Sequence, residues 1–362
     1  MRLRQPAIAV VAATLAIGMA LVSMPALAKK KARRIAASAA RPDSAPDSVT
    51  YGRRDDVMRF AEEVAERRQI DAEWLRSALA EAKFVPSIAR YIMPPPAGTA
   101  KNWAAYRDRF VEPRRIGAGV AFWNAHEAWL RRAEERFGVP PEIVVGIVGV
   151  ETLYGERMGQ FRIVDALATL SFDFPAGRRD RSGFFRSELE AFLAMCRERG
   201  IDPLDWRGSY AGAVGMPQFM PSSIVAHGVD FDGDGVVDLH GSAADVIGSV
   251  ANFLANAGWQ HGLPTHFEVA VPVDARERAT LLGPDILPLF GPDEFMELGA
   301  RLPEAAMLLE TSKLALVELQ NGDAAPSYVA GTTNFYAITR YNWSSYYAMA
   351  VIALGEAVKR AR

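Results

Sequence analysis

A single acidic residue stands in the last turn of an apolar stretch near the middle of the chain. The stretch runs from Pro140 to Gly155, and its composition predicts a buried helix with Glu151 close to its end. Apolar surroundings and the negative end of a helix dipole both raise the pKa of a carboxyl group. Glu151 is therefore a candidate proton donor of the kind that a glycosidic leaving oxygen requires. The alternative is an ordinary helix-end glutamate that reaches solvent or pairs with Arg157 or Arg162.

A second stretch, residues 208–223, is dense in glycine and proline. Such a composition predicts a tightly turned surface loop with a backbone that can approach a ligand closely. Loops held by a helical scaffold are common places for binding groups. A structural turn without a ligand is the alternative interpretation.

Regularly spaced carboxylates mark a third stretch. At the first, third, fifth and ninth positions of a calcium loop stand Asp230, Asp232, Asp234 and Asp238. Val236 at the seventh position can offer only its backbone carbonyl, and the twelfth position is Gly241 where a bidentate glutamate is usual. Asp245 is the candidate that closes the coordination shell of a longer loop. We expect a structural calcium ion and no organic cofactor, and a metal-free Asp/Gly turn is the alternative.

Length and charge limit the classes of protein that fit. The chain has 362 residues, is 50% hydrophobic and has a net charge of −2, so it can form two or three packed units. Beyond residue 50 it carries 33 basic and 41 acidic groups, which argues against a nucleic-acid binder. The one cysteine, Cys196, excludes an internal disulfide framework and is expected to be a core thiol.

The first 28 residues have the pattern of a secretory signal peptide. Arg2 and Arg4 precede an apolar run over residues 7–22, and small residues stand at Ala26 and Ala28. We therefore expect export to the periplasm with cleavage after Ala28. An uncleaved membrane anchor is the alternative, although the apolar run is short for a span. No cysteine lies near the cleavage site, so a lipoprotein is not expected.

Periodicity and composition divide the rest of the chain. Most segments have a helical pattern, whereas residues 267–273 and 314–319 alternate like strands. The fold class is therefore expected to be mainly α, of the α+β type. The predicted units are a signal peptide (1–28), a disordered basic, Ala- and Pro-rich linker (29–50), an α-helical domain (51–139), a core with the calcium loop (140–262), a small β domain (263–330) and a C-terminal return to the core (331–362).

Four motifs in this order resemble the membrane-bound lytic murein transglycosylase B family, including its soluble form. They are Val148–Gly155, Gly208–Ser223, Asp230–Val250 and Asn334–Val351. The resemblance covers most of residues 55–360 and implies a lysozyme-like core with an EF-hand-like calcium loop, a helical domain and a small β domain. It also implies cleavage of the β-1,4 bond between MurNAc and GlcNAc in peptidoglycan. The product would carry a 1,6-anhydro ring instead of a reducing end.

The resemblance assigns roles to individual residues. Glu151 matches the sole catalytic acid and base of the family. The implied substrate contacts are Ser209, Gln218, Tyr341, Asn342, Tyr347, Tyr106 and Phe253. Tyr106 is expected to close over the glycan from the helical domain. Phe253 stands where relatives have tyrosine, which keeps a stacking face but loses a hydroxyl.

A single carboxylate changes the expected mechanism. Ordinary glycosidases use two, but one acid suffices if the acetamido group of the substrate stabilises C1 and the substrate's O6 hydroxyl attacks it. A hydrolytic muramidase on the same scaffold is the alternative, and it needs a second carboxylate such as Asp165 or Asp173. A non-catalytic scaffold protein that binds the cell wall is a further alternative.

The expected partners follow from the same reasoning. Peptidoglycan glycan strands are the expected substrate, bound by a monomer. Proteins of cell-wall synthesis or division are further candidate partners, whereas nucleic acid is not.

Overall fold

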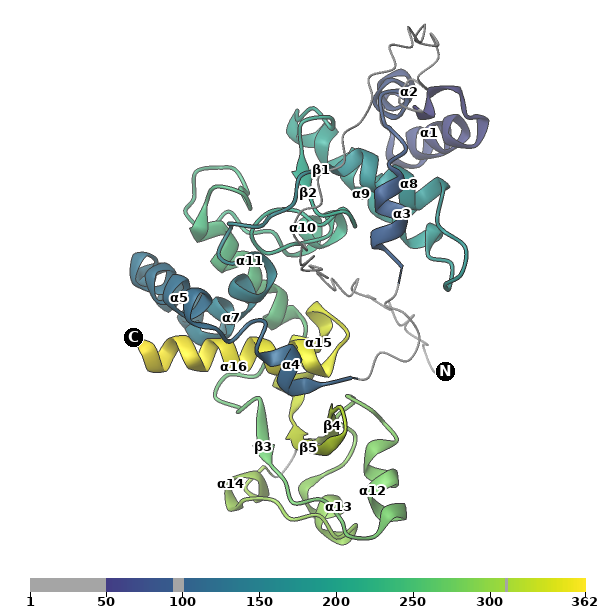
Figure 1. The fold of residues 1–362 in the computed structure, drawn as a ribbon. Helices are drawn as coiled ribbons and strands as arrows, with labels where there is room; N and C mark the ends of the chain where they lie inside the picture. The colour runs from purple at the N-terminus through teal and green to yellow at the C-terminus, as the bar shows by residue number, and fades with distance from the viewer. Residues whose placement is uncertain (1–49, 94–100, 310–311) are drawn as a thin grey trace, which may run out of the picture.

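The computed structural model describes residues 50–93, 101–309 and 312–362. These residues fold mainly into helices, with one two-stranded and one three-stranded antiparallel sheet (Figure 1). The predicted signal peptide and nearly all of the predicted linker lie outside the described residues. Among the helices that the structure describes, none combines the length and the apolarity that a membrane crossing requires.

One lobe of the molecule gathers helices from two separate parts of the chain (Figure 1). They are α1 (Asp55–Arg68), α2 (Ala72–Ala80), α3 (Pro86–Tyr91), α8 (Ile163–Phe172) and α9 (Ser182–Arg199), after a 3-10 turn at Tyr51–Arg53. The cap of α2 is Asp71, which accepts a hydrogen bond from Trp74 N at 2.7 Å. Gly200 ends α9 in the left-handed conformation, at φ 65°. Both boundaries follow from ordinary capping signals in the sequence.

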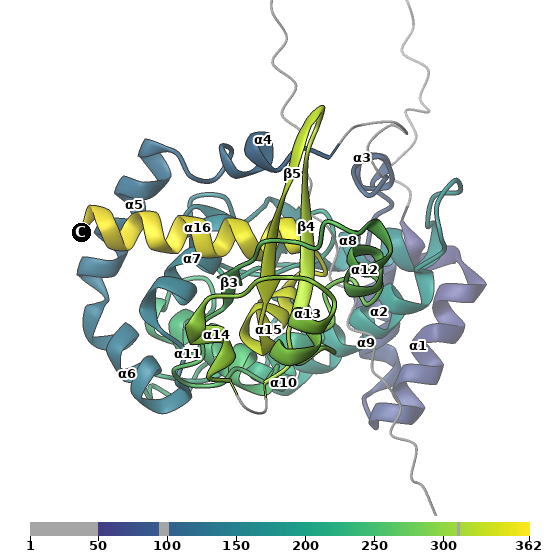
Figure 2. The same cartoon turned by 90° about the horizontal axis from the view of Figure 1, so that it is seen from below.

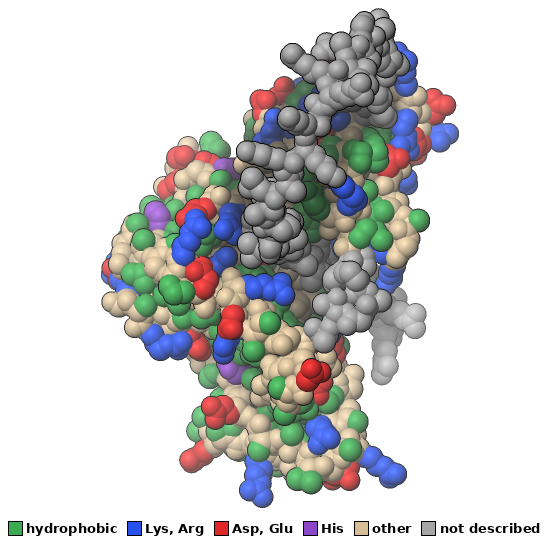
Figure 3. All heavy atoms as spheres, in the orientation of Figure 1, with side chains coloured by type: hydrophobic (Ala, Val, Ile, Leu, Met, Phe, Trp, Pro, Cys, Tyr) green, Lys and Arg blue, Asp and Glu red, His purple; other side chains and the backbone are tan. Residues whose placement is uncertain are grey.

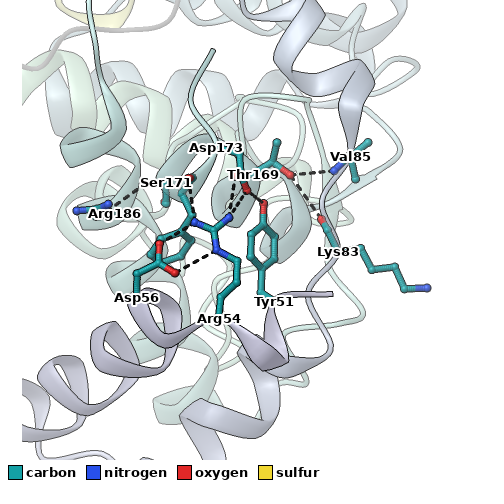
Figure 4. Close-up of polar contacts among 10 residues, drawn as sticks. Tyr51, Arg54, Asp56, Lys83, Val85, Thr169, Ser171, Asp173 and Arg186 are labelled. Atoms are coloured by element: carbon teal, nitrogen blue, oxygen red, sulfur yellow. Dashed lines mark hydrogen bonds and ion pairs between the residues drawn. The ribbon is translucent and has the colours of Figure 1, made fainter. Parts of the chain in front are cut away.

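Polar contacts fasten the N-terminal helices to the end of α8 (Figure 4). Arg54 Nη1 donates to both carboxylate oxygens of Asp173 at 2.8 Å. The hydroxyl of Tyr51 donates to the same carboxylate at 2.7 Å, and Arg54 also pairs with Asp56 at 2.7 Å. Asp173 therefore joins two parts of the chain that are distant in sequence.

The centre of the molecule is built from helices of the middle and the end of the chain. They are α5 (Pro113–Ala125), α6 (Glu127–Phe137), α7 (Pro141–Thr152), α11 (Ala243–Asn256), α15 (Thr333–Tyr341) and α16 (Ser345–Ala361). Helices α7 and α16 lie side by side, with α5 against both (Figures 1 and 2). A Cβ atom on Gly146 would lie 2.3 Å from the carbonyl oxygen of Val351, and one on Gly355 would lie 2.1 Å from that of Glu142. Glycine at these two positions therefore allows the two backbones to touch.

A small sheet lies at the opposite end of the molecule from the lobe of α1–α3 (Figure 1). Its strands, in the order β3-β5-β4, are β3 (His266–Glu268), β5 (Ala324–Gly331) and β4 (Ala315–Asn321). The long β4–β5 hairpin is seen edge-on in Figure 2. Around the sheet lie α12 (Ala275–Leu282), α13 (Pro292–Glu297) and α14 (Glu304–Met307). Their buried apolar side chains form a hydrophobic cluster separate from the main one.

The strands differ from the sequence prediction in two ways. Strand β3 ends at Glu268 instead of continuing to residue 273, because Ala270 pairs with Arg301 outside the sheet. Strand β5 has no alternating pattern that would predict it, and it contains Pro326. The proline falls in an irregularity of the β4–β5 register, where the ladder is already interrupted.

Residues 208–223 are mostly buried, which corrects the predicted surface loop. Val214 and Phe219 exchange backbone hydrogen bonds of 2.8 and 3.1 Å, so the loop satisfies its own polar groups. A Cβ atom on Gly215 would lie 2.3 Å from the carbonyl oxygen of Leu239. The glycines of this loop therefore allow backbone segments to lie in direct contact. Short elements frame the loop, namely β1 (Phe161–Arg162), β2 (Arg207–Gly208) and α10 (Pro221–His227).

One hydrophobic cluster connects helices from residues 51–139, 140–262 and 331–358. Cys196 is buried in it, which confirms the predicted core thiol. On the face drawn in Figure 3, acidic and basic side chains of the described residues are interspersed. The main core is thus shared between segments that are far apart in the sequence.

Candidate active site

The carboxyl group of Glu151 lies where the end of α7 meets the first turn of α16. The hydroxyl of Tyr347 donates to Glu151 Oε1 at 2.6 Å. Burial raises the pKa of Glu151 from 4.5 to about 7, and the hydrogen bond from Tyr347 opposes this rise because it favours the carboxylate. The group can therefore hold a proton near neutral pH and also release it.

The end of α7 differs from the prediction. The sequence pattern places the stop at Gly155, but the helix ends at Thr152, and Leu153 and Tyr154 follow in the left-handed conformation at φ 52° and 56°. Such backbone is strained for residues other than glycine, and strain of this kind gathers at functional sites. Thr152 Oγ1 donates to Met216 O at 2.8 Å and accepts from Gly155 N at 3.0 Å. These bonds fix the turn that follows the acid and stop the helix early.

Two tyrosines lie beside the acid. The rings of Tyr341 and Tyr347 are nearly parallel, with centroids 6.2 Å apart and an interplanar angle of 13°. The Tyr341 hydroxyl donates to the carbonyl of Pro217 in the buried loop. Burial raises the pKa of Tyr347 well above 10, so its hydroxyl stays protonated and keeps donating to Glu151.

Phe253 supports this pair from behind. Its side chain is only 8% exposed, and its ring packs against Phe219, His227 and Tyr341 with centroids 5.7, 4.9 and 4.9 Å away. Phe253 therefore packs against Tyr341, and little of its ring is left exposed for contact with a sugar. Its predicted role as a substrate contact stays a prediction.

Asn342 follows α15 and is 9% exposed. Its Oδ1 atom has no hydrogen-bond partner among the described residues. Buried acceptors are normally paired, and an unpaired one is costly. Ser344 caps α16 by accepting from Tyr347 N at 3.3 Å, which holds the segment in place. The free oxygen of Asn342 is thus suited to an N–H group of a ligand.

Tyr106 reaches the site from α4 (Trp103–Arg107). Its ring packs against Phe110 and Tyr346, with centroids 5.2 and 5.9 Å apart. Burial first, and then the negative charge of Glu151, raise the pKa of Tyr106 to about 12. Tyr106 therefore lies within electrostatic range of Glu151, and no hydrogen bond between the two is found among the described residues.

Arg115 of α5 is a buried cation that the sequence does not single out. It is 8% exposed, and its Nη1 atom donates to the carbonyls of Gly149 at 2.5 Å and Val150 at 3.4 Å. Its guanidinium also lies over the ring of Phe110, 5.2 Å from the centroid. A cation at this end of α7 offsets the helix dipole and holds the turn that carries Glu151. The sequence does not predict that Arg115 is buried, because an arginine in the first turn of a helix is ordinarily exposed.

Ser209 and Gln218 lie in the buried loop, and both contact its backbone. Ser209 Oγ accepts from Ala211 N at 3.3 Å and from Ala213 N at 3.0 Å. Gln218 Nε2 donates to Gly215 O at 2.9 Å. Within the described structure, the groups that remain for a ligand are the Ser209 O–H and the Gln218 Oε1 atom.

The two candidates for a second carboxylate are held in ion pairs. Asp165 Oδ1 lies 2.7 Å from Arg162 Nη2, and Asp173 binds Arg54 (Figure 4). Arg162 is thereby the partner of Asp165. No ion pair to Glu151 is found among the residues that the structure describes, so the alternative of a salt-bridged helix-end glutamate is not supported.

Three of the predicted metal ligands come together. Carboxylate oxygens of Asp230, Asp232 and Asp245 lie within 4.8 Å of one another. Asp245 is 1% exposed and stands in the first turn of α11. A compact set of hard oxygen donors suits calcium, so these residues fit the expected ion.

The other predicted ligands lie outside this group of three. Asp234 Oδ1 accepts from the backbone N–H of Val236 at 2.8 Å, and Asp238 Oδ1 accepts from Gly241 N at 2.9 Å. The Val236 side chain is exposed. These contacts shape the loop around the three carboxylates.

The chain is similar to known proteins over most of its length. The transglycosylase SLT domain family matches residues 52–356. Membrane-bound lytic murein transglycosylase B of Escherichia coli is 39% identical over 320 residues, which are 86% of this chain and 85% of that protein.

Solved structures of similar chains include soluble lytic transglycosylase SltB1 from Pseudomonas aeruginosa, with a TM-score of 0.76 and 39% identity over 85% of this chain and 99% of that one. Escherichia coli Slt35 in complex with calcium has a TM-score of 0.71 and 38% identity over 85% of this chain and 94% of that one. Pseudomonas aeruginosa SltB3, in complex with NAG-NAM-pentapeptide, has a TM-score of 0.69 and 29% identity over 83% of this chain and 79% of that one.

Proposed function

This chain belongs to the transglycosylase SLT domain family, and on that premise we propose that Glu151 alone supplies both the acid and the base of its reaction. Membership confirms the resemblance found in the four motifs and the predicted fold class, mainly helical with a lysozyme-like core. The chain is a lytic murein transglycosylase, a lyase that acts on peptidoglycan and is expected to leave 1,6-anhydroMurNAc.

The proposed reaction has two steps on the same carboxyl group. Protonated Glu151 gives its proton to the glycosidic oxygen as the C1–O bond breaks, and the acetamido oxygen of the MurNAc residue bonds to C1. Carboxylate Glu151 then takes the proton of the O6 hydroxyl as O6 attacks C1 and the acetamido oxygen leaves. The proton that was given is replaced, so the enzyme is regenerated and no water is consumed.

One observation carries this assignment: Glu151 has a pKa of about 7 and a hydrogen bond from Tyr347 of 2.6 Å. A group that exchanges a proton in both directions works best when its pKa is near the operating pH. Tyr347 orients the carboxylate, and Asn342 offers a free buried oxygen to the acetamido N–H. Asp165 and Asp173 are paired elsewhere, which disfavours the hydrolytic muramidase.

The pH profile tests the assignment. Because the first step needs protonated Glu151, we expect kcat/KM on purified peptidoglycan to fall as the pH rises through about 7. Tyr347→Phe removes the bond that stabilises the carboxylate, which raises the pKa of Glu151 further. The descending limb should therefore move to higher pH, and the rate at the plateau should fall by roughly tenfold or more because the acid loses its orienting partner.

Tyr336→Phe is the matched control, since it removes a tyrosine hydroxyl from α15 that does not contact Glu151. Its profile should coincide with that of the wild type. A descending limb that stays at the same pH in Tyr347→Phe would show that another group sets the profile.

We also infer that a structural calcium ion binds Asp230, Asp232 and Asp245. The likeness to calcium-bound Slt35 supports this ion, and so does the grouping of the three carboxylates within 4.8 Å. Bound calcium would relieve the repulsion among these charges and tie α11 to the loop before it.

Calcium is expected to raise the melting temperature of the protein. Occupancy at about 100 times the Kd adds roughly 3 kcal/mol to the free energy of unfolding. Thermal melts in chelator and in added calcium should therefore differ for the wild type and coincide for Asp245→Asn. Asp293→Asn, an exposed carboxylate on α13, should respond to calcium as the wild type does. If the wild type melts at the same temperature in chelator and in added calcium, the protein does not bind the proposed ion.

Location and partners complete the proposal. Proteins of this family bind peptidoglycan glycan strands, and we propose that this chain does so as an exported periplasmic monomer with its signal peptide cleaved after Ala28. Proteins of cell-wall synthesis or division remain candidate partners. Sequencing the N-terminus of the mature protein checks the cleavage site.

A further inference from the structure

Tyr154 follows the proposed acid by three residues, and its side chain lies back against the helix that carries the acid. Its backbone is in the left-handed conformation, at φ 56°, where the chain turns after Thr152. A Cβ atom on Gly149 would lie 2.4 Å from the Tyr154 hydroxyl oxygen. The side chain of Tyr154 therefore reaches back past Glu151 and closes the turn in which Glu151 stands.

The hydroxyl of Tyr154 lies where α5, α7 and α16 pack together (Figures 1 and 2). A Cβ atom on Gly119 of α5 would also lie 2.4 Å from this oxygen, and 2.5 Å from Val358 Cγ2 of α16. Gly119 and Gly149 therefore leave the space that the end of the phenol ring fills. Helix α16 also carries Tyr347, so the acid and its hydrogen-bond donor belong to two helices that meet at Tyr154.

Two buried polar atoms in this region have no partner. Neither the Tyr154 hydroxyl oxygen nor Arg115 Nε makes a hydrogen bond to any of the described residues. Glu112 Oε1 lies 3.9 Å from Arg115 Nε, which is too far for a hydrogen bond. The charge of Arg115 opposes the rise that burial causes in the pKa of Tyr154, so the two groups are within electrostatic range. Arg115 Nε is a donor and the hydroxyl oxygen can accept, so each offers what the other lacks.

The two residues hold opposite ends of the turn that carries the acid. Arg115 Nη1 donates to the carbonyls of Gly149 and Val150, just before Glu151, and Tyr154 stands just after it. The pKa of Glu151 is governed by burial and by the bond from Tyr347. The described structure shows no hydrogen bond from Arg115 or Tyr154 to the carboxyl group. Their influence on the acid therefore passes through the geometry of the turn.

We propose that Tyr154 is a positioning residue, which together with Arg115 fixes the turn on both sides of Glu151 and directs the carboxyl group toward Tyr347. The inference rests on the proposed function, because it takes Glu151 as the acid and base. A water molecule between Arg115 Nε and the Tyr154 oxygen would pair both atoms and join the two side chains.

Tyr154→Phe tests the role, because it removes the hydroxyl and keeps the ring. A looser turn weakens the bond from Tyr347, so kcat on purified peptidoglycan should fall about tenfold. KM should stay unchanged, since a buried hydroxyl does not contact the substrate. The bond from Tyr347 favours the carboxylate, so the descending limb of kcat/KM should move to higher pH, by less than in Tyr347→Phe. A limb that stays in place or moves to lower pH would overturn the proposal.

Double variants test the route of the effect. In the Tyr347→Phe background the bond is already absent, so adding Tyr154→Phe should move the limb no further. A further shift as large as that of Tyr154→Phe alone would contradict a route through Tyr347. Arg115→Lys keeps the positive charge but lacks the Nε donor, and it should move the limb as Tyr154→Phe does. Combining these two changes should add little, and fully additive shifts would contradict joint action of Arg115 and Tyr154.

Tyr51→Phe is the matched control for a loss of stability. Tyr51 is 1% exposed, and its hydroxyl donates to Asp173 at 2.7 Å in the lobe of α1–α3. Its replacement should lower the melting temperature and leave kcat and the pH limb as in the wild type. If Tyr51→Phe moved the limb as Tyr154→Phe does, lost stability would explain both results and the positioning role would fail.

The proposed function and this inference fail in different ways. If Tyr347→Phe leaves the limb in place, the assignment of Glu151 fails, and the positioning role fails with it. If Tyr347→Phe moves the limb and Tyr154→Phe does not, the assignment of Glu151 stands and only the role of Tyr154 is wrong.

Discussion

Replacing Glu151 with glutamine is expected to lower kcat on peptidoglycan by about 10³-fold. Glutamine keeps the shape of the side chain and can still accept the hydrogen bond from Tyr347, but it can neither give nor take the proton. The loss should appear in kcat, because the missing transfer belongs to the chemical steps. The release of soluble muropeptides from purified peptidoglycan measures it.

Glu142→Gln provides the matched control for this result. It makes the same change in the first turn of the same helix, where Glu142 pairs with Lys359 at the surface. Its activity should be that of the wild type. Near-normal activity in Glu151→Gln would mean that another group is the acid.

The same substitution should also stabilise the fold at high pH. The pKa of Glu151 is raised from 4.5 to about 7, so between these values the folded state binds more protons than the unfolded one. Stability conferred by this group therefore falls as the pH rises through that window. At pH 8 the variant should have a higher melting temperature than the wild type. Its free energy of unfolding should be larger by on the order of 3 kcal/mol at most. At pH 4 the two should nearly coincide.

The second large effect is expected at the contact between α7 and α16. Gly355→Ala would place a Cβ atom 2.1 Å from the backbone oxygen of Glu142. The group that the new Cβ atom would meet is backbone and not a flexible side chain. The two helices must therefore move apart. Overpacking of this kind costs about 3 kcal/mol, and the shift would carry Tyr347 away from Glu151. Chemical denaturation should show the loss of stability, and activity should fall with it.

Gly117→Ala is the control for this substitution. Gly117 lies in α5, and a Cβ atom there would meet nothing within 4 Å. The same change should therefore stabilise the protein by up to about 1 kcal/mol, since alanine is the better helix former. Similar destabilisation by both variants would mean that helix propensity, and not the contact between the helices, sets the outcome.

Local signals in the sequence account for much of the fold. The cap at Asp71, the stop at Gly200 and the apolar run of α7 each depend on neighbouring residues alone. Glu151 could be singled out because the two effects that raise its pKa, apolar surroundings and a position at the helix end, can both be recognised from the residues of its own helix. The family resemblance then supplied Tyr347 and Asn342, which lie far along the chain.

What the sequence could not show depends on distant partners. Arg115 looks like an exposed helix residue until α7 is packed against α5, and the packing of Phe253 against Tyr341 joins residues far apart in the sequence. Strand β5 forms because it pairs with β4. Its sequence has no alternating apolar pattern that would predict a strand. The stop of α7 at Thr152 likewise comes from a bond to Met216 in another segment.

Mass spectrometry of the sugar ends that wild-type enzyme leaves on purified peptidoglycan is the most direct measurement. We expect muramyl ends in the 1,6-anhydro form, lighter by one water than a reducing end, and we expect them to vanish with Glu151→Gln. Reducing muramyl ends as the main product would exclude the proposed reaction, because they require a water that a lone acid and an attacking O6 do not use.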